Sequence, residues 1–243
     1  TVTTIGDNAF YYLKKLKRLV LGDHVRIIGR SAFAYCGLEG TLQIPESCES
    51  IGYGAFAQST SLTGTLVIPD GCKIVSTSAF GGTGISELHI GAGVTKFENQ
   101  GNMQALHTIT VSQDNETYIA YDNVVYKKDY SALVFPAHQT DIHLPDAFGA
   151  QKVDETSASD SRINYGGNFL RDWSFVENVH ISDENPYYKS IDGVLYTKDG
   201  QDLLLCPQAH QSNVEIPSGC KRIVSSAFYY CRNINSVHVT STV

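Results

Sequence analysis

The sequence has few charged residues and no long apolar run. Charged side chains make up 18% of the 243 residues, below the ~25% usual for soluble domains, whereas 42% of the residues are hydrophobic. This balance excludes a disordered chain. No stretch reaches the roughly 18 apolar residues of a membrane-spanning helix, so we expect no membrane insertion within this segment. The net charge of −7 argues against a nucleic-acid partner, because phosphate backbones require a positive surface.

The N-terminus has neither an initiator Met nor the pattern of a signal peptide. Both ends of the chain fall inside a repeat and show no polar cap, although a solenoid needs its ends covered. We therefore expect the sequence to be a segment of a longer polypeptide; the alternative is a solenoid with irregular caps.

The sequence also lacks the short motifs of common enzyme sites. It has no Gly-x-Ser-x-Gly elbow, no His-Glu-x-x-His, no phosphate-binding Gly-x-x-x-x-Gly-Lys loop and no Rossmann glycine fingerprint. The six cysteines show no Cys-x-x-Cys spacing. Cys206 precedes His210 closely, but Phe135 fills the equivalent position of a sister block, which favours packing over a nucleophile. We expect no catalysis and no cofactor.

Two sequence patterns recur with the same period. Ile-Gly-x-x-Ala-Phe begins at Ile5, Ile28 and Ile51, and a variant begins at Val75, so the repeat is 23 or 24 residues long. The second pattern is apolar, variable, apolar, which is typical of a short strand with one buried face. It occurs at 19–21, 42–44, 66–68 and 88–90. A unit with one apolar face must stack on its neighbours, so the period predicts a repeat solenoid.

The same repeat phase explains three of the six cysteines. Four residues after the last strand residue, Cys48, Cys72 and Cys220 alternate with Val25 and Val94, which predicts a small buried slot. Cys48 and Cys72 would then lie on adjacent turns. Strand spacing brings their Cα atoms within disulfide range, but in-register parallel neighbours rarely orient properly, so free thiols are favoured.

After Phe97 the period lengthens, because a longer block appears twice. Residues 118–136 and 188–207 align with an offset of about 70, and Asp192-Gly193 and Asp199-Gly200 are strong turn signals. The sequence therefore predicts a mostly β repeat solenoid, with short helical turns and two inserted β-hairpin blocks. Residues 1–96 form an array of short repeats, and 97–243 hold a degenerate repeat and the two blocks, continuous with the first part as one domain. The polar stretch around Asp154 is expected to be an exposed loop.

These patterns resemble the BspA-like leucine-rich repeat family of bacterial surface proteins. The best copies are Ile28 to Pro45, which carries Ile-Gly-x-x-Ala-Phe-x-x-Cys and Leu-x-Ile-Pro, and Asp192 to Pro217, which carries Asp-Gly-Val-Leu-Tyr-x-Lys-Asp-Gly. The resemblance covers nearly the whole chain and departs at Asn123, where the second block has Gly193. It implies an extracellular or cell-surface protein with a role in adhesion to host matrix or other cells, and it does not imply an enzyme.

The candidate ligand-binding residues share the outward phase of successive strands. Inward Leu, Ile and Val fix the backbone of a solenoid, whereas outward side chains are free to vary, so function is expected on the outer face. The row and its flanking residues are Arg18, Val20, Gln43, Val67, Glu87, His89, Thr110, His143, His180, Glu215 and His238. We expect this face to hold a protein or glycan partner, such as host extracellular matrix; the alternative is a structural spacer that binds nothing.

Three further alternatives concern individual side chains. The order His143, His180, Glu215, His238 permits a zinc site or a pH-sensitive face, although outward positions are ordinarily just solvated. The turns at 114–116 and 183–185 permit weak calcium binding, but Asx side chains more commonly close such turns. Tyrosines follow Ala-Phe at 11, 12, 229 and 230, where packing is favoured over an aromatic contact patch.

Overall fold

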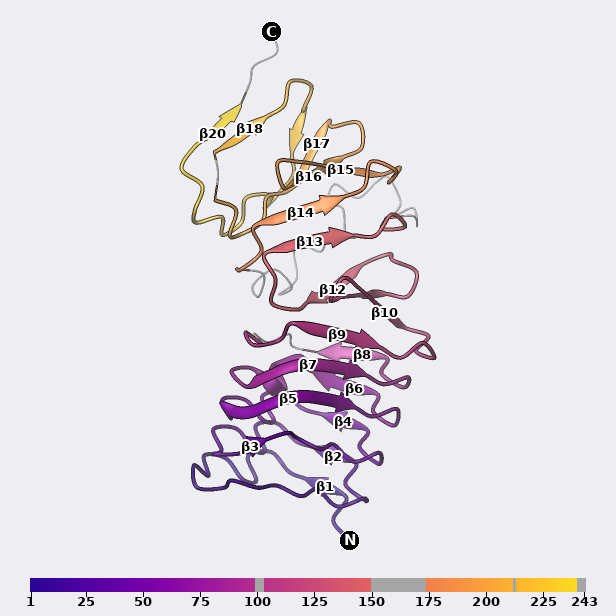
Figure 1. Ribbon diagram of the computed structural model, residues 1–243, viewed down its shortest axis with the longest axis vertical. Coiled ribbons are helices and arrows are strands. Elements are labelled where there is room, and N and C mark those ends of the chain that lie inside the picture. Colours follow the sequence, from indigo (N-terminus) through magenta and orange to yellow (C-terminus); the bar gives the residue numbers. More distant parts are fainter. Residues whose placement is uncertain (99–102, 150–173, 212, 240–243) are drawn as a thin grey trace. The chain divides into compact units, whose positions relative to one another are not determined.

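The computed structural model describes residues 1–98, 103–149, 174–211 and 213–239. The chain forms two compact units, Thr1–Lys128 and Asp129–Val243, and each is described by itself (Figure 1). The predicted continuity of residues 1–96 and 97–243 as one solenoid domain stays a prediction. The loop expected around Asp154 lies outside the described residues. None of the described helices could cross a membrane.

The first unit contains a parallel sheet built from the Ile-Gly pattern. Its strands follow one another in the order β1-β2-β4-β6-β8, and all neighbours are parallel. Four strands hold the first residues of the four copies of the pattern: β1 (Thr4–Ile5), β2 (Ile27–Ile28), β4 (Ser50–Ile51) and β6 (Ile74–Ser76). The fifth strand, β8 (Lys96–Glu98), continues the sheet at the degenerate repeat. The sheet is therefore the direct product of the repeat, as Figure 1 shows.

Glycine and phenylalanine occur in this pattern for two different physical reasons. A Cβ atom added to Gly52 would lie 3.0 Å from the backbone nitrogen of Arg30, so only glycine allows the turns to approach this closely. The phenyl rings of Phe33, Phe56 and Phe80 are fully buried and stack with their planes within 6° of parallel. Their centroids are 5.3 and 5.8 Å apart, and this column forms the centre of the core.

The second sheet of the first unit has the order β3-β5-β7-β9 and is also parallel. Its strands are β3 (Glu39–Gly40), β5 (Ser61–Ile68), β7 (Gly84–Ile90) and β9 (Thr108–Val111). Leu42, Leu66 and Leu88 are buried, as the repeat phase predicts. The small slot is confirmed at Cys48 and Cys72, which are fully buried, whereas Cys220 is partly exposed.

Strands predicted at 19–21 and 42–44 are not assigned in the structure, so this part of the prediction is wrong. The phase nevertheless holds, since Leu42 is buried and Gln43 is exposed. In the first two turns, the backbone hydrogen bonds to the next turn lie a few residues earlier in the sequence than predicted. Glu39 N donates to Lys17 O at 3.1 Å, and β3 pairs with β5. The only described helix is the single 3₁₀ turn η1 (Thr77–Phe80), which agrees with the expected short helical turns.

A β-hairpin closes the described part of the first unit. The strands β10 (Tyr118–Tyr121) and β11 (Val124–Lys127) are antiparallel. They are joined by Asp122 and Asn123, whose φ angles are 47° and 57°. Positive φ at both positions is the conformation of a two-residue hairpin turn. Asn123 therefore replaces the glycine of the second block without changing the turn, because asparagine tolerates this conformation.

The second unit contains the sister block and two short parallel pairs. The strands β15 (Tyr188–Ile191), β16 (Val194–Thr197) and β17 (Asp202–Leu205) form an antiparallel meander, and β19 (Arg222–Ile223) pairs with β17 in parallel. The hairpin expected around the turn signal Asp199-Gly200 is confirmed, since β16 and β17 pair on either side of it. The strand β15 was not expected from the sequence. The remaining strands are β12 (Leu133–Pro136), β13 (Asp141–Leu144), β14 (Asn178–Ile181), β18 (Val214–Ile216) and β20 (Val237–Val239).

Candidate functional site: the outward strand face

The outward row is best formed on β5, β7 and β9 of the first unit. Val67 pairs with His89, and His89 pairs with Thr110, in parallel register. Val67 keeps 53% of its surface exposed, while Leu66 and Leu88 beside it are buried. The row is therefore an outer surface with an apolar centre and polar neighbours.

A polar network crosses these three strands. The Thr65 hydroxyl donates to Glu87 Oε2 at 2.8 Å, and His89 Nε2 lies 4.0 Å from the same carboxylate oxygen. On its other side, His89 Nδ1 is hydrogen-bonded to the Thr110 hydroxyl. The imidazole is thus held between an acid and a hydroxyl, which fixes its orientation on the exposed face.

The first two members of the row belong to turns without strand pairing at that position. Val20 is 93% exposed, and Arg18 and Gln43 are also exposed. All three face solvent as predicted. They do not form a hydrogen-bonded ladder with Val67, so the regular part of the row is shorter than the sequence pattern indicated.

In the second unit the row continues as two separate pairs. His143 pairs with His180 across β13 and β14, and the two imidazoles stack with centroids 4.8 Å apart. Glu215 pairs with His238 across β18 and β20, where His238 Nδ1 lies 2.7 Å from Glu215 Oε2. Each pair occupies its own two-stranded sheet. Within the described residues, no group of three or more His, Cys, Asp or Glu is placed to hold a metal ion.

The sequence pattern did not identify Asp141 as part of this surface. His180 Nε2 lies 2.9 Å from Asp141 Oδ1, the Asn178 amide donates to the same oxygen at 3.0 Å, and the Thr140 hydroxyl donates to Oδ2 at 2.8 Å. The contact to His180, followed by those to Thr140 and Asn178, lowers the pKa of Asp141 to about 2. The available signal was its phase, because Asp141 stands two residues before His143 as Glu87 stands before His89.

The low pKa of Asp141 predicts a small loss of stability in acid. A carboxyl whose pKa falls on folding stabilises the protein fully above its unfolded pKa, and this contribution disappears as the pH falls from about 4 to about 2. Because the Asp141 side chain is 43% exposed, we expect only about 0.5 kcal/mol. Urea unfolding at pH 5 and pH 2.5 should show the stability gap between wild type and Asp141→Asn closing at the lower pH. A gap of equal size at both values would contradict the assignment.

All six cysteines are free thiols. Hydrogen bonding to Cys48, together with burial, raises the pKa of the Cys72 thiol. The Cys206 thiol is likewise shifted upward in pKa by its hydrogen bond with Cys231 and by burial. A raised pKa keeps a thiol protonated and unreactive at neutral pH, which agrees with a packing role.

The pairing of Cys206 with His210 is not a catalytic arrangement. His210 is buried, and its Nδ1 is hydrogen-bonded to the carbonyl oxygen of Glu177 at 2.9 Å. Cys206 Sγ donates toward the carbonyl oxygen of Pro207. Both side chains thus have backbone partners, and the raised pKa of Cys206 opposes formation of a thiolate nucleophile.

Comparison with known proteins identifies the repeat. The sequence matches the BspA type leucine rich repeat region in six copies, over residues 1–107 and 207–243. No curated protein matches the chain.

Several solved structures share the fold. A leucine-rich repeat protein from Eubacterium ventriosum is 18% identical and covers 97% of this chain and 57% of its own length, with a TM-score of 0.58. A leucine rich cell surface protein from Faecalibacterium prausnitzii is 22% identical, covering 99% of this chain and 77% of its own (TM-score 0.55). A leucine-rich repeat protein from Bacteroides ovatus is 18% identical, covering 97% and 70% (TM-score 0.52). The chain therefore spans less than two thirds of the length of the Eubacterium protein.

Proposed function

The chain belongs to the BspA type leucine-rich repeat family, and from this premise we propose that it is a non-catalytic binding module of a bacterial surface protein. Its outward strand face binds a protein or glycan partner outside the cell. The observation that carries this proposal is the register of Val67, His89 and Thr110 on three hydrogen-bonded parallel strands. The strand backbone holds these outward side chains at a fixed spacing.

The chemistry of this face supports binding. Val67 offers apolar surface, while Glu87, His89 and Thr110 offer hydrogen-bonding groups whose orientation is set by their mutual contacts. Interfaces combine an apolar centre with a polar rim in this way. Preorganised groups also lose little conformational entropy when a partner binds.

The location at the cell surface is part of the same proposal. It is supported by the family and by the description of the Faecalibacterium relative as a leucine rich cell surface protein. The solenoid also suits such a location, because stacked repeats present an extended face to large partners.

The test is a binding screen of this chain against extracellular matrix proteins and glycans, followed by variants of the face. Val67→Glu places a charge at the centre of the row and is expected to weaken binding of any hit at least tenfold, or about 1.4 kcal/mol. His89→Trp should have a similar effect by steric block. Thermal unfolding of both variants should match wild type, because the two side chains are on the outer face.

The matched control is Ile27→Glu, which adds the same charge at a half-exposed apolar position of the other sheet. Ile27→Glu should bind like wild type. Equal loss of binding in Val67→Glu and Ile27→Glu, or no loss in either, would show that the outward strand face is not the binding site. A screen without any hit would instead favour the alternative that the segment is a structural spacer.

A further inference from the structure

The same six-residue pattern occurs in the first and in the last repeat of the chain. Ala-Phe-Tyr-Tyr-x-Lys covers residues 9–14, and Ala-Phe-Tyr-Tyr-x-Arg covers 227–232. In each copy the second tyrosine has a positive φ, 66° at Tyr12 and 59° at Tyr230. The cation then lies over its ring, with Lys14 Nζ 4.5 Å and Arg232 Cζ 5.0 Å from the respective centroids. The turn geometry therefore builds a tyrosine–cation pair twice.

These tyrosines are not core residues. Tyr12 is 51% exposed and Tyr230 is 48% exposed. The Tyr12 ring packs on Tyr11 and Tyr35, and the Tyr230 ring packs on Tyr229, which agrees with the expected packing of partly buried side chains. About half of the surface of each tyrosine is left for contact with another molecule.

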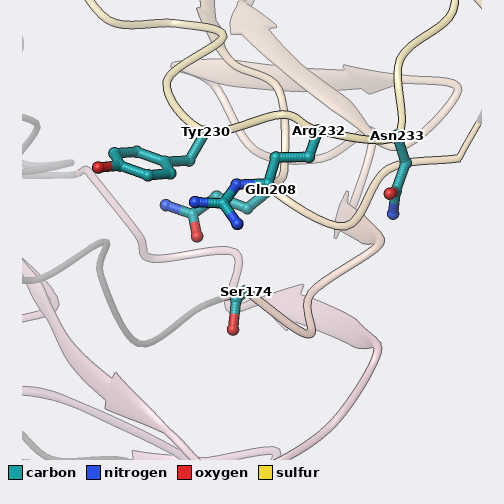
Figure 2. Close-up of a pocket in the computed structure, with 5 residues that line it drawn as sticks. All are labelled: Ser174, Gln208, Tyr230, Arg232 and Asn233. Atoms are coloured by element: carbon teal, nitrogen blue, oxygen red, sulfur yellow. The ribbon is translucent and has the colours of Figure 1, made fainter.

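In the second copy, the tyrosine and the cation line a pocket together. A cavity of about 450 Å³ is lined by Ser174, Gln208, Tyr230, Arg232 and Asn233. Figure 2 shows the Gln208 amide beside the Arg232 guanidinium, with the Tyr230 ring on one side, Asn233 on the other and the Ser174 hydroxyl below. The volume lies within the roughly 300–1,000 Å³ of small-molecule sites.

The lining has an unusual chemical balance. It holds one cation and no acid among these residues, together with two amides and a hydroxyl. Asn233 Nδ2 donates to the carbonyl oxygen of Ala209 at 3.3 Å, which fixes its amide while its oxygen can still accept. Arg232 is exposed and held against Tyr230, so its planar donors are oriented in advance.

We propose that this pocket binds a sugar residue that carries a carboxylate, such as a uronic acid at the end of a glycan. The Arg232 guanidinium pairs with the carboxylate, which is its preferred bidentate partner. Gln208, Asn233 and Ser174 exchange hydrogen bonds with sugar hydroxyls, which both donate and accept. The exposed Tyr230 ring supplies a flat apolar surface for the C–H face of the sugar.

The lining favours such a sugar over other anions. A simple carboxylate such as acetate would use Arg232 alone and leave the amides and the hydroxyl without a role. A phosphate would carry nearly two charges, whereas Arg232 is the single cation among the described residues that line the pocket. A neutral sugar would use the polar groups and the ring but not the charge, so it serves as the natural comparison ligand.

The experiment is a titration of the ¹⁵N-labelled chain, followed by NMR, with methyl glucuronide and methyl glucoside, which differ only in the carboxylate. The backbone signals of Tyr230, Arg232 and Asn233 should shift, and the glucuronide should bind about tenfold more tightly, the usual effect of one charge-assisted hydrogen-bond pair. Arg232→Gln should reduce the preference for glucuronide to about one. Arg232→Lys, which keeps the charge but loses the planar fork, should retain part of it.

The matched control is Lys14→Gln, which removes the cation from the sister tyrosine in the first unit. This variant should bind glucuronide like wild type. Equal affinity for the two sugars, an unchanged preference in Arg232→Gln, or signals that move equally with acetate would each overturn the proposal. Folding of every variant is checked in the same spectra, because signals of β13 and β14 should stay in place.

Discussion

Replacing Phe56 with alanine is expected to reduce the free energy of unfolding by about 3–5 kcal/mol, the usual cost of a buried Phe→Ala change. Phe56 is fully buried, and its ring stacks on Phe33 on one side and on Phe80 on the other. The substitution leaves a cavity between two turns that cannot collapse, because hydrogen bonds between turns fix their spacing, such as that from Phe56 N to Ala79 O at 2.8 Å. Urea unfolding followed by circular dichroism measures the loss.

The chain supplies a matched control for this change. Phe10 occupies the same position of the first repeat and stacks only on Phe33, at 5.0 Å. It is half-exposed, so Phe10→Ala should cost about 1 kcal/mol, because little additional surface reaches water. Similar losses in both variants would show that the aromatic column does not form the centre of the core.

The repeat period was sufficient to separate inside from outside. Successive side chains of a strand point to opposite faces. The residue type found at one position of the repeat therefore indicates whether that position is buried in every turn. Leu66 and Leu88 are buried, and Val67 is exposed, as this argument requires. Even Gln43, which lies outside any assigned strand, keeps its outward orientation.

The period was not sufficient to locate the polar contacts between turns. His180 meets Asp141 across a sequence separation of 39 residues. The repeat phase pairs Asp141 with Asn178 and His143 with His180, but it does not specify that the His180 imidazole reaches Asp141, two positions away on the neighbouring strand. The pocket was missed for the same reason, because Gln208 and Arg232 come from different turns. Sequence patterns fix which residues face outward, whereas three-dimensional stacking decides which of them meet.

The lengths of the strands also could not be predicted from the sequence pattern. Residues 42–44 and 66–68 carry the same apolar, variable, apolar pattern, yet only the second forms part of a strand. Strand assignment depends on hydrogen bonds to at least one neighbouring strand, which the pattern of a single turn does not contain. Burial therefore follows the repeat more closely than pairing does.

The second large effect is expected from Asn115, which joins two turns of the first unit. Its side chain is fully buried, and its Nδ2 donates to the carbonyl oxygens of Gly91 and Val94 at 2.9 and 3.0 Å. Its Oδ1 accepts from the backbone amides of Thr117 and Tyr118 at 2.8 and 2.7 Å. The prediction that side chains of this segment close the turn is confirmed at this residue.

Asn185 repeats this arrangement in the second unit. Its amide donates to the carbonyl oxygens of Asp146 and Phe148, and its Oδ1 accepts from the amides of Tyr187 and Tyr188. One side chain in each block thus satisfies four backbone groups where the chain enters the hairpin. The two sites are chemically equivalent, so the same substitution can be tested in both units.

Asn115→Ala is expected to lower the free energy of unfolding by about 3–5 kcal/mol, because four backbone groups lose their partner at about 1 kcal/mol each. Asp114→Ala, at the exposed neighbouring position, should stay within about 0.5 kcal/mol of wild type. Urea unfolding at pH 7 measures both. A loss below about 1 kcal/mol in Asn115→Ala would show that water replaces the amide and that the hairpin entry does not depend on this residue.

The variant Asn115→Asp tests the hydrogen bonds that the side chain accepts separately from those that it donates. The aspartate keeps the acceptor for Thr117 and Tyr118 but turns a negative oxygen toward the carbonyl groups of Gly91 and Val94, so burial and repulsion disfavour its ionised form. A carboxyl whose pKa is raised on folding stabilises the folded state below its unfolded pKa and loses that contribution as the pH rises. The variant should therefore be much less stable than wild type at pH 7 and recover part of the difference below about pH 4. A difference that does not change with pH would mean that the carboxylate is solvated, which contradicts a buried asparagine in this position.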